Sequence, residues 1–283
     1  MKLLSWNIQW GRGADGRVDL ARTVAAIRAA GDFDLICLQE VASNFAGLPG
    51  GAAEDGVGVL TQAFPAHTAV FGAAVDVPAA GGGRALFGNL LLSRLPVGQV
   101  FRHLLPAPVD ERMPGMQRVC VEAVIDGARG PLRVLSTHLE YYSAVQRGAQ
   151  MQALRALQLE AMARAAVPAV NKESNPAFAA WPRPAAALLC GDFNCEPDSL
   201  HYTELQRADA SGRLPWRDAW RVLHGDLPHA PSVGLHGADW PDRPYCCDFF
   251  FVSAELEAHL QSVQVEAATA ASDHQPVLLT LDA

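Results

Sequence analysis

The stretch Ala187-Leu-Leu-Cys-Gly-Asp-Phe-Asn194 is a short apolar run that leads into two polar side chains. Four apolar residues followed by a glycine predict a buried strand over residues 187–190. Asp192 and Asn194 are two positions apart, so in an extended chain their side chains point to the same side. We therefore expect a sheet edge that presents a carboxylate and an amide together.

The same arrangement recurs at other strand ends. Apolar strands predicted to end near residues 6, 38 and 137 lead into polar side chains, and a further polar pair precedes the strand predicted at 277–281. These residues are Asn7, Glu40, His138, Asp273 and His274. Any one of them alone is more typical of a turn or a helix cap. Together they indicate that functional side chains lie close together at one edge of a sheet, where the strands end.

Short apolar runs alternate with amphipathic helical segments over the whole chain. Strands are predicted at 3–8, 35–38, 89–93, 119–125, 132–137, 187–190, 249–252 and 277–281, and helices at 18–30 and 144–165. The segments 47–58, 171–184 and 225–244 are rich in Gly or Pro and are predicted to be loops. No internal repeat or change of composition marks a linker. We predict one α/β domain over residues 1–283.

Composition and charge limit the classes of function. Half of the 283 residues are hydrophobic and 18% are charged, which is typical of a globular protein. The net charge of −8 disfavours extensive nonspecific binding to nucleic acid. The N-terminus turns polar too early for a secretory signal, and no apolar run approaches the roughly 20 residues that span a bilayer. We expect a cytoplasmic protein with no membrane anchor and no obligate protein partner.

The six cysteines are scattered and form no Cys-x-x-Cys pair. They are Cys37, Cys120, Cys190, Cys195, Cys246 and Cys247. Most of them lie within apolar runs, so we expect buried, reduced thiols and no zinc site.

Seven motifs, in order, resemble the motif set of the endonuclease/exonuclease/phosphatase superfamily. They are Ser-Trp-Asn7-Ile, Leu-Gln-Glu40-Val, Gly-Asn89-Leu-Leu-Leu-Ser-Arg94, Thr-His138-Leu, Gly-Asp192-Phe-Asn194, Cys-Asp248-Phe-Phe-Phe-Val and Ser-Asp273-His274-Gln-Pro. Each motif alone is weak evidence, but the ordered set extends from residue 3 to residue 281 and is specific. The resemblance implies a four-layer α/β sandwich of two packed mixed β-sheets flanked by helices.

The resemblance also implies a role for each motif residue. Glu40 corresponds to the principal Mg²⁺ ligand, with Asn7 and Asp273 contributing, and Mn²⁺ is the alternative ion. Asp192 would orient or deprotonate the attacking water while Asn194 holds a phosphate oxygen. His274 would bind the phosphoryl group and stabilise its developing charge. Asp248 would fix the orientation of that imidazole.

One stretch departs from the pattern of the family's deoxyribonucleases. There, the counterpart of His138 is supported by a glutamate shortly before the Asn89 motif, whereas this chain has Gly81-Gly82-Gly83-Arg84 and no acid. We therefore expect His138 to bind phosphate rather than to act as a general acid. Asn89 and Arg84 are the predicted substrate-binding residues, although Arg84 also fits a solvated loop arginine.

These observations predict a metal-dependent phosphoester hydrolase that cleaves phosphodiester bonds by in-line attack of a metal- and Asp-activated water. The expected partner is a phosphoester substrate, and the net charge favours a small or nucleotide-type diester. A DNA endonuclease, exonuclease or repair nuclease is the alternative enzyme. A phosphate-ligand binding protein with a silent site is the alternative from another class, but no core motif position is lost.

Overall fold

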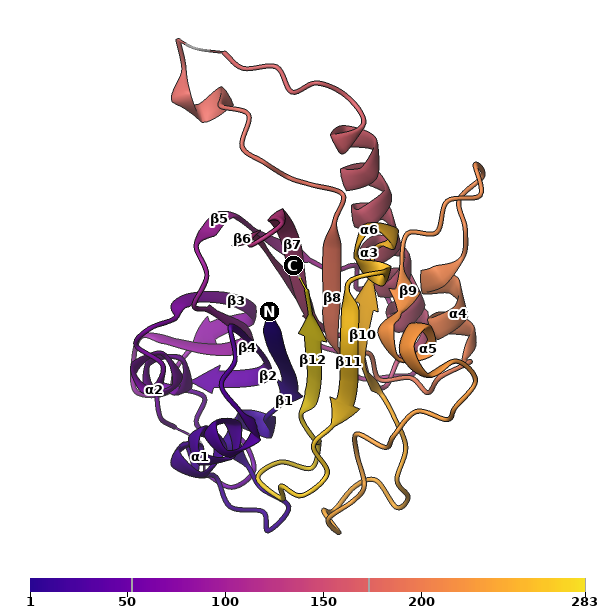
Figure 1. The fold of residues 1–283 in the computed structure, drawn as a ribbon. Helices are drawn as coiled ribbons and strands as arrows, with labels where there is room; N and C mark the ends of the chain where they lie inside the picture. Colours follow the sequence, from indigo (N-terminus) through magenta and orange to yellow (C-terminus); the bar gives the residue numbers. More distant parts are fainter. Residues whose placement is uncertain (52, 173, 283) are drawn as a thin grey trace.

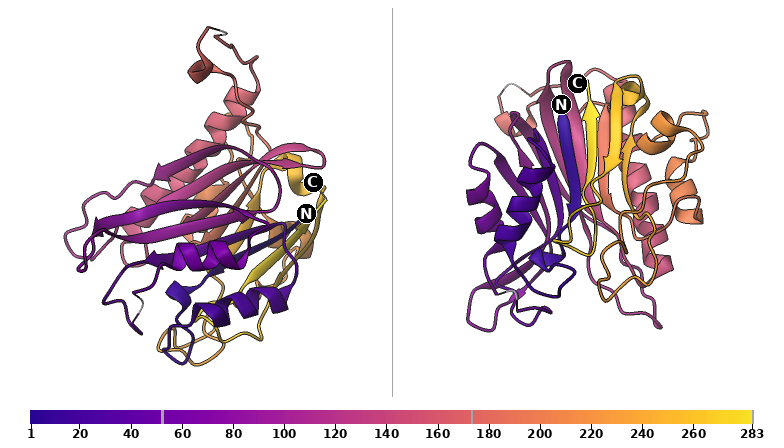
Figure 2. Two further views of the ribbon diagram at one scale, coloured as in Figure 1. Left: turned by 90° about the vertical axis from the view of Figure 1, so that its left-hand side faces the viewer. Right: turned by 60° about the horizontal axis from the view of Figure 1, so that its bottom comes forward.

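Two β-sheets pack face to face, with helices on their outer surfaces. The computed structural model describes residues 1–51, 53–172 and 174–282 (Figure 1). Each sheet has six strands and is mixed, so the predicted four-layer α/β sandwich is confirmed. Figure 2 shows the layers from two further directions.

The first sheet has the strand order β11-β12-β1-β2-β4-β3. Its strands are β1 (Lys2–Asn7), β2 (Leu35–Ser43), β3 (Thr68–Pro78), β4 (Arg84–Ser93), β11 (Leu260–Val265) and β12 (Val277–Leu281). The second sheet has the order β5-β6-β7-β8-β10-β9. Its strands are β5 (Val97–Leu104), β6 (Val119–Gly127), β7 (Gly130–His138), β8 (Ala187–Asp192), β9 (Arg217–Asp218) and β10 (Asp248–Val252). The pairs β1–β2 and β7–β8 are parallel, and the remaining pairs are antiparallel.

Three apolar clusters hold the layers together. The cluster between the sheets includes Leu3 and Leu35 from the first sheet and Leu188 and Phe250 from the second. Outside the first sheet lie α1 (Leu20–Ala30) and α2 (Gly56–Ala63), and outside the second lie α3 (Ala144–Ala165) and α4 (Leu200–Gln206). The short helices α5 (Ala219–His224) and α6 (Ala254–Glu257) flank β10. Because the central strands are covered on both faces, they appear in the sequence as continuous apolar runs.

The sequence predicted the central strands and the long helices best. Both ends of α3 and of β12 are as predicted, and α1 buries an apolar face formed by Leu20, Val24 and Ile27. The predicted loop 47–58 ends too late, because Asp55 caps α2 by accepting a hydrogen bond from the Gly58 amide. In α3, Met151 and Leu154 are in the core, whereas Met162 is half-buried.

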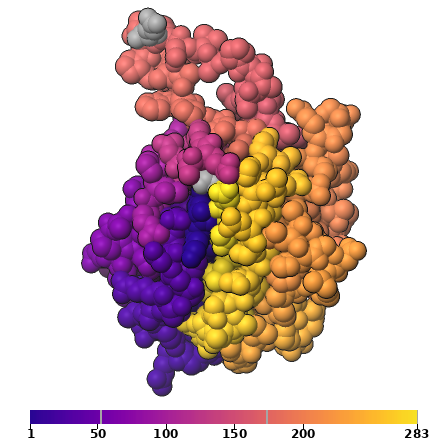
Figure 3. All heavy atoms as spheres, in the orientation of Figure 1, coloured from indigo at the N-terminus to yellow at the C-terminus, as the bar shows by residue number. Residues whose placement is uncertain are grey.

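The two ends of the sandwich differ. The segment between α3 and β8, which contains the short 3-10 helix Pro176–Phe178, projects from the end where β1 begins (Figures 1 and 3). The long loop between α5 and β10 lies at the other end, where β1 finishes (Figure 1). None of the described helices is both long and apolar enough to cross a membrane.

Candidate active site

Strand register brings the predicted site residues together at the end of the sandwich where β1 and β8 finish. In the second sheet, Asp192 is the register partner of His138 on β7 and of Asp248 on β10. In the first sheet, Asn7 pairs with Gln39, the residue before Glu40. The Asn7 amide joins the two sheets, since its Nδ2 donates to Glu40 Oε1 at 3.1 Å and to Asp192 Oδ2 at 3.0 Å.

Glu40 is placed by a bulge in β2. We expected this strand to end at residue 38, but it continues to Ser43, and Gln39 and Glu40 together face one residue of β4. Glu40 has φ of 57°, in the left-handed region that non-glycine residues rarely adopt. A bulge turns a side chain out of the regular alternation of the strand. The bulge therefore explains how Glu40 reaches the site from within a strand.

Glu40 is a largely buried carboxyl beside another carboxylate. Burial first, and then the charge of Asp273, raise the pKa of Glu40 to about 7. The hydrogen bond from Asn7 and the charges of His274 and Arg118 lower this pKa, but they offset the rise only in part.

His274 belongs to a chain of buried hydrogen bonds. Its Nδ1 lies 2.9 Å from Asp248 Oδ2, and the Ser232 hydroxyl donates to the same oxygen at 2.6 Å. Burial alone would lower the pKa of His274, but the charges of Asp248 and Asp192 prevail and raise it well above its usual value. These carboxylates therefore favour the protonated, cationic form of the ring, whose Nε2 lies 3.7 Å from Asp192 Oδ2.

His138 is in the opposite protonation state. Burial and the charge of Arg118 lower its pKa to about 3. Its Nε2 lies 3.0 Å from Asn194 Nδ2, and because an amide nitrogen can only donate, Nε2 accepts and the ring proton is on Nδ1. The second imidazole of the site is therefore neutral.

Asp273 is held by residues that the sequence analysis did not single out. The Gln9 side chain donates from Nε2 to Asp273 Oδ2 at 2.8 Å. The Ser272 hydroxyl donates to the Asn7 carbonyl at 2.8 Å, which fixes the loop before β12 against the end of β1. Gln9 follows the Asn7 motif directly, but nothing in the sequence pairs it with a residue 264 positions away.

The two predicted substrate-binding residues differ in position. Asn89 is buried, borders a small hollow with His138 and Arg118, and donates from Nδ2 to the Val119 carbonyl at 2.9 Å, which ties β4 to β6. Arg84 is exposed on the β3–β4 hairpin and donates from Nε to Asp76 Oδ1 at 2.6 Å. Within the described residues, Arg84 contacts no other predicted site residue. Its role in binding substrate remains a prediction.

Arg118 is a buried cation beside the site. Its Nε donates to Glu140 Oε2 at 3.2 Å, and its charge lowers the pKa of both His138 and Glu40. In the described part of the chain, its Nη1 is buried without a hydrogen-bond partner. Arg118 lies outside the seven motifs, so nothing in the sequence assigns it to the site.

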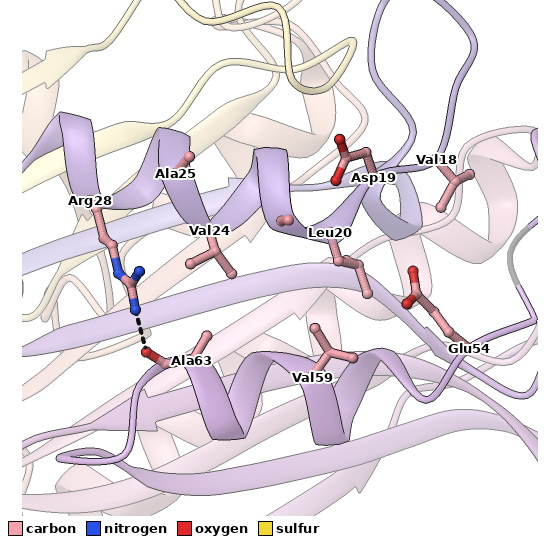
Figure 4. Close-up of a pocket in the computed structure, with 10 residues that line it drawn as sticks. Val18, Asp19, Leu20, Val24, Ala25, Arg28, Glu54, Val59 and Ala63 are labelled. Carbon is pink, nitrogen blue, oxygen red and sulfur yellow. Dashed lines mark hydrogen bonds between the residues drawn. The ribbon is translucent and has the colours of Figure 1, made fainter.

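Two other features are not part of this arrangement. Cys247 Sγ lies 3.5 Å from Asp248 Oδ2, but burial raises the pKa of the thiol well above its usual value, and that carboxylate oxygen already binds Ser232 and His274. A hollow of about 510 Å³ between α1 and α2 has a mainly aliphatic lining (Figure 4). None of the predicted site residues lines it.

The fold and the motifs place the chain in a known family. Residues 4–274 match the model of the Endonuclease/Exonuclease/phosphatase family, so the chain belongs to this family and the expected resemblance is confirmed. No curated protein sequence matches the chain.

Several solved structures share the fold. An endonuclease/exonuclease/phosphatase from Beutenbergia cavernae DSM 12333 is 22% identical, with 99% of this chain and 70% of that chain covered and a TM-score of 0.67. One from Bacteroides vulgatus is 17% identical, with 99% and 98% covered and a TM-score of 0.67. A 3′ phosphatase, NExo, from Neisseria, bound to a product DNA hairpin, is 17% identical, with both chains fully covered and a TM-score of 0.62. At these identities the similarity shows the fold.

Proposed function

We propose that this protein is a divalent-metal-dependent phosphodiesterase whose active site is the cluster around Asn7, Glu40 and Asp192. The observation that carries the proposal is the Asn7 side chain, which joins carboxylates of both sheets, with a charged and a neutral imidazole on either side. Metal-assisted phosphoryl chemistry uses carboxylates together with groups that meet negative charge on phosphate oxygens.

The donor atoms of Glu40, Asn7 and Asp273 fit a hard divalent cation. Mg²⁺ and Mn²⁺ prefer carboxylate and amide oxygens. The pKa of Glu40, raised by burial and by the charge of Asp273, supports a site where a bound cation would stabilise the ionised carboxylate. When bound there, the ion would act as a Lewis acid on the phosphate oxygens.

The other residues of the site would activate the water, bind the phosphate oxygens and orient the imidazole rings. Asp192 Oδ2 lies 3.0 Å from Asn7 Nδ2 and 3.7 Å from His274 Nε2, which suits a carboxylate that orients a water and accepts its proton. The His274 imidazolium donates to a phosphoryl oxygen as charge develops there. Asp248 keeps this ring oriented. Neutral His138 binds a further phosphate oxygen, and Asn194, whose Nδ2 donates to His138 Nε2 and to the Leu139 carbonyl, keeps this ring oriented.

Hydrolysis of bis-p-nitrophenyl phosphate after treatment with EDTA tests this proposal. We expect no activity in the chelator and recovery with Mg²⁺ or Mn²⁺. The matched control is Glu160→Gln on the exposed face of α3, which should behave like the wild type. A parallel panel of p-nitrophenyl phosphate, RNA, plasmid DNA and an abasic duplex defines the preferred ester. Full activity in EDTA, or no activity on any phosphoester, would contradict the proposal.

The charge distribution favours a small diester over long nucleic acid. Four arginines between residues 207 and 221 are the clustered cations of the sequence, and each contacts a carboxylate: Arg207 with Glu204, Arg213 with Asp209, Arg217 with Glu257 and Arg221 with Asp198. Arginines already neutralised in this way add little to a phosphate-binding edge. We therefore expect weak and strongly salt-sensitive action on DNA.

A further inference from the structure

A hollow of about 400 Å³ opens directly beside the proposed phosphate site. Asn194 forms part of its wall, and the same side chain contacts His138 Nε2. The volume lies within the range of small-molecule sites, roughly 300–1,000 Å³. Anything attached to a phosphate at the site can therefore extend into this hollow.

Aromatic rings form one side of the hollow. Trp240 and Tyr245 line it, with ring centroids 5.9 Å apart and planes at 83°. Tyr141 packs against Trp240 on the other side, at 5.1 Å and 82°. Trp240 is 37% exposed, so part of its indole is accessible to a ligand.

The aromatic residues are held in position before any ligand binds. Arg147 Nη1 donates to the carbonyls of Glu140 and Tyr141, each at 2.8 Å. On the other side, Asp239, the residue before Trp240, accepts from Arg12 Nη2 at 2.8 Å. Loops fixed in this way lose little freedom on binding, which favours affinity.

The remaining lining indicates what kind of group would fit. Ser199 and His201 add neutral polar atoms, and the charged residues of the lining, Arg147, Glu196, Asp242 and Arg243, are two of each sign. Balanced charge disfavours a second phosphate, and a polar rim disfavours an alkyl chain. A flat, uncharged ring with polar edges suits both the aromatic wall and the polar groups.

We propose that this hollow binds the nucleobase of a nucleoside esterified to the reacting phosphate, so that the substrate is a nucleotide-type phosphodiester. The proposal rests on the proposed phosphodiesterase function of the adjoining site. Stacking of a base on an aromatic side chain tolerates different bases. We therefore expect selection for the presence of a base more than for its identity.

Competitive inhibition tests the proposal with two ligands that differ in the base. Thymidine 5′-monophosphate and 2-deoxyribose 5-phosphate are compared as inhibitors of bis-p-nitrophenyl phosphate hydrolysis by the Mg²⁺-loaded enzyme. We expect the nucleotide to bind at least tenfold more tightly. In Trp240→Ala the ratio of the two inhibition constants should fall by about tenfold, within the range for loss of one stacked base. Trp240→Phe should keep most of the ratio.

Trp181→Ala is the matched control, because Trp181 is also exposed but lies on the segment that projects from the other end of the molecule. It should change neither inhibition constant. Equal inhibition by the two ligands in the wild type, with hydrolysis intact, would overturn the base-binding proposal and leave the phosphodiesterase proposal standing. A ratio of the two inhibition constants that is the same in Trp240→Ala as in the wild type would also overturn the base-binding proposal. Absence of hydrolysis by the wild type would overturn both.

Discussion

Glu122 and Glu40 are both largely buried glutamates, but their surroundings are opposite. Glu122 on β6 accepts hydrogen bonds from Arg183 at 3.1 and 3.3 Å, and its carboxylate lies 2.8 Å from His103 Nε2 and 3.5 Å from Arg133. Burial alone would raise the pKa of Glu122, but these partners outweigh it and lower the pKa to about 2. In this cluster the chain supplies its own counter-charges.

Around Glu40 the partners do not outweigh burial. Burial and the charge of Asp273 raise the pKa of Glu40 to about 7, and the charges of His274 and Arg118 offset this rise only in part. A buried charge with matched partners is typical of a structural cluster, whereas a buried charge without them is costly and indicates a functional site. The comparison thus separates a cluster that holds the fold from the cluster that we propose binds a cation and a phosphate. Variants in each cluster should therefore affect different properties.

The largest effect should come from the catalytic cluster. His274→Ala removes the imidazolium, and we expect kcat on bis-p-nitrophenyl phosphate to fall on the order of 10²-fold or more. Asp248→Asn should also impair turnover, because it removes the charge that keeps this ring protonated. The denaturation midpoint of each variant is measured alongside. A wild-type kcat for His274→Ala on every substrate would refute the assignment.

The second largest effect should be a loss of stability when the cluster around Glu122 is disrupted. Glu122→Gln leaves Arg133 and Arg183 without a buried counter-charge, which typically costs about 3–5 kcal/mol. Urea denaturation measures this loss, and kcat per folded molecule should stay at the wild-type value. A loss of stability below about 1 kcal/mol would show that Glu122 does not stabilise the fold as its contacts indicate.

The pH dependence of stability in EDTA should differ in sign between the two glutamates. Because the pKa of folded Glu122 is lowered, its contribution is present above its unfolded pKa near 4.5 and is lost as the pH falls toward 2. Because the pKa of folded Glu40 is raised, its charge destabilises the metal-free protein as the pH rises from about 4.5 to 7.

Glu40→Gln should therefore stabilise the metal-free protein at pH 8, by on the order of 1 kcal/mol. Thermal or urea unfolding in EDTA at pH 4, 6 and 8 measures both trends. A Glu40→Gln variant that is less stable than the wild type at pH 8 would show that negative charge in this cluster is balanced after all.

The smallest effect concerns Ser232, which donates to Asp248 at 2.6 Å. We infer that it is a positioning residue, so Ser232→Ala should lower kcat several-fold, the usual scale for one hydrogen bond of about 1 kcal/mol. KM should stay close to the wild-type value, and Ser232→Thr should restore part of kcat. A change in KM alone would assign Ser232 to substrate binding instead.

The sequence predicted the centre of each sheet but not the edges. Strands such as β1, β7 and β8 are buried on both faces and appear as apolar runs. The strands β5 and β11 lie at sheet edges, and polar residues interrupt their sequences. The edge strand β3 contains an apolar stretch but is only partly buried, and it was not predicted. Edge pairing depends on neighbours distant in the chain, so local pattern could not reveal it.

The candidate site was likewise predictable only in part from the sequence. Motif residues at strand ends could be predicted because each motif is local. The bulge at Glu40 depends on the pairing of β2 with β4, and the supports from Gln9, Ser232 and Arg118 depend on contacts between distant segments. The pKa difference between the two histidines also arises from burial and from neighbours brought together by folding. Residue type and spacing contain none of this information.

Electron paramagnetic resonance of the free ion measures Mn²⁺ binding to the metal-free protein at pH 8 and tests whether Glu40 belongs to a cation site. We predict that the wild type and Glu160→Gln bind Mn²⁺ equally, since Glu160 lies on an exposed face and pairs with Arg164. Glu40→Gln, which keeps the shape of the side chain but not its charge, should bind at least tenfold more weakly. Equal binding by all three proteins would contradict the account, because the cluster around Glu40 would then not be the cation site.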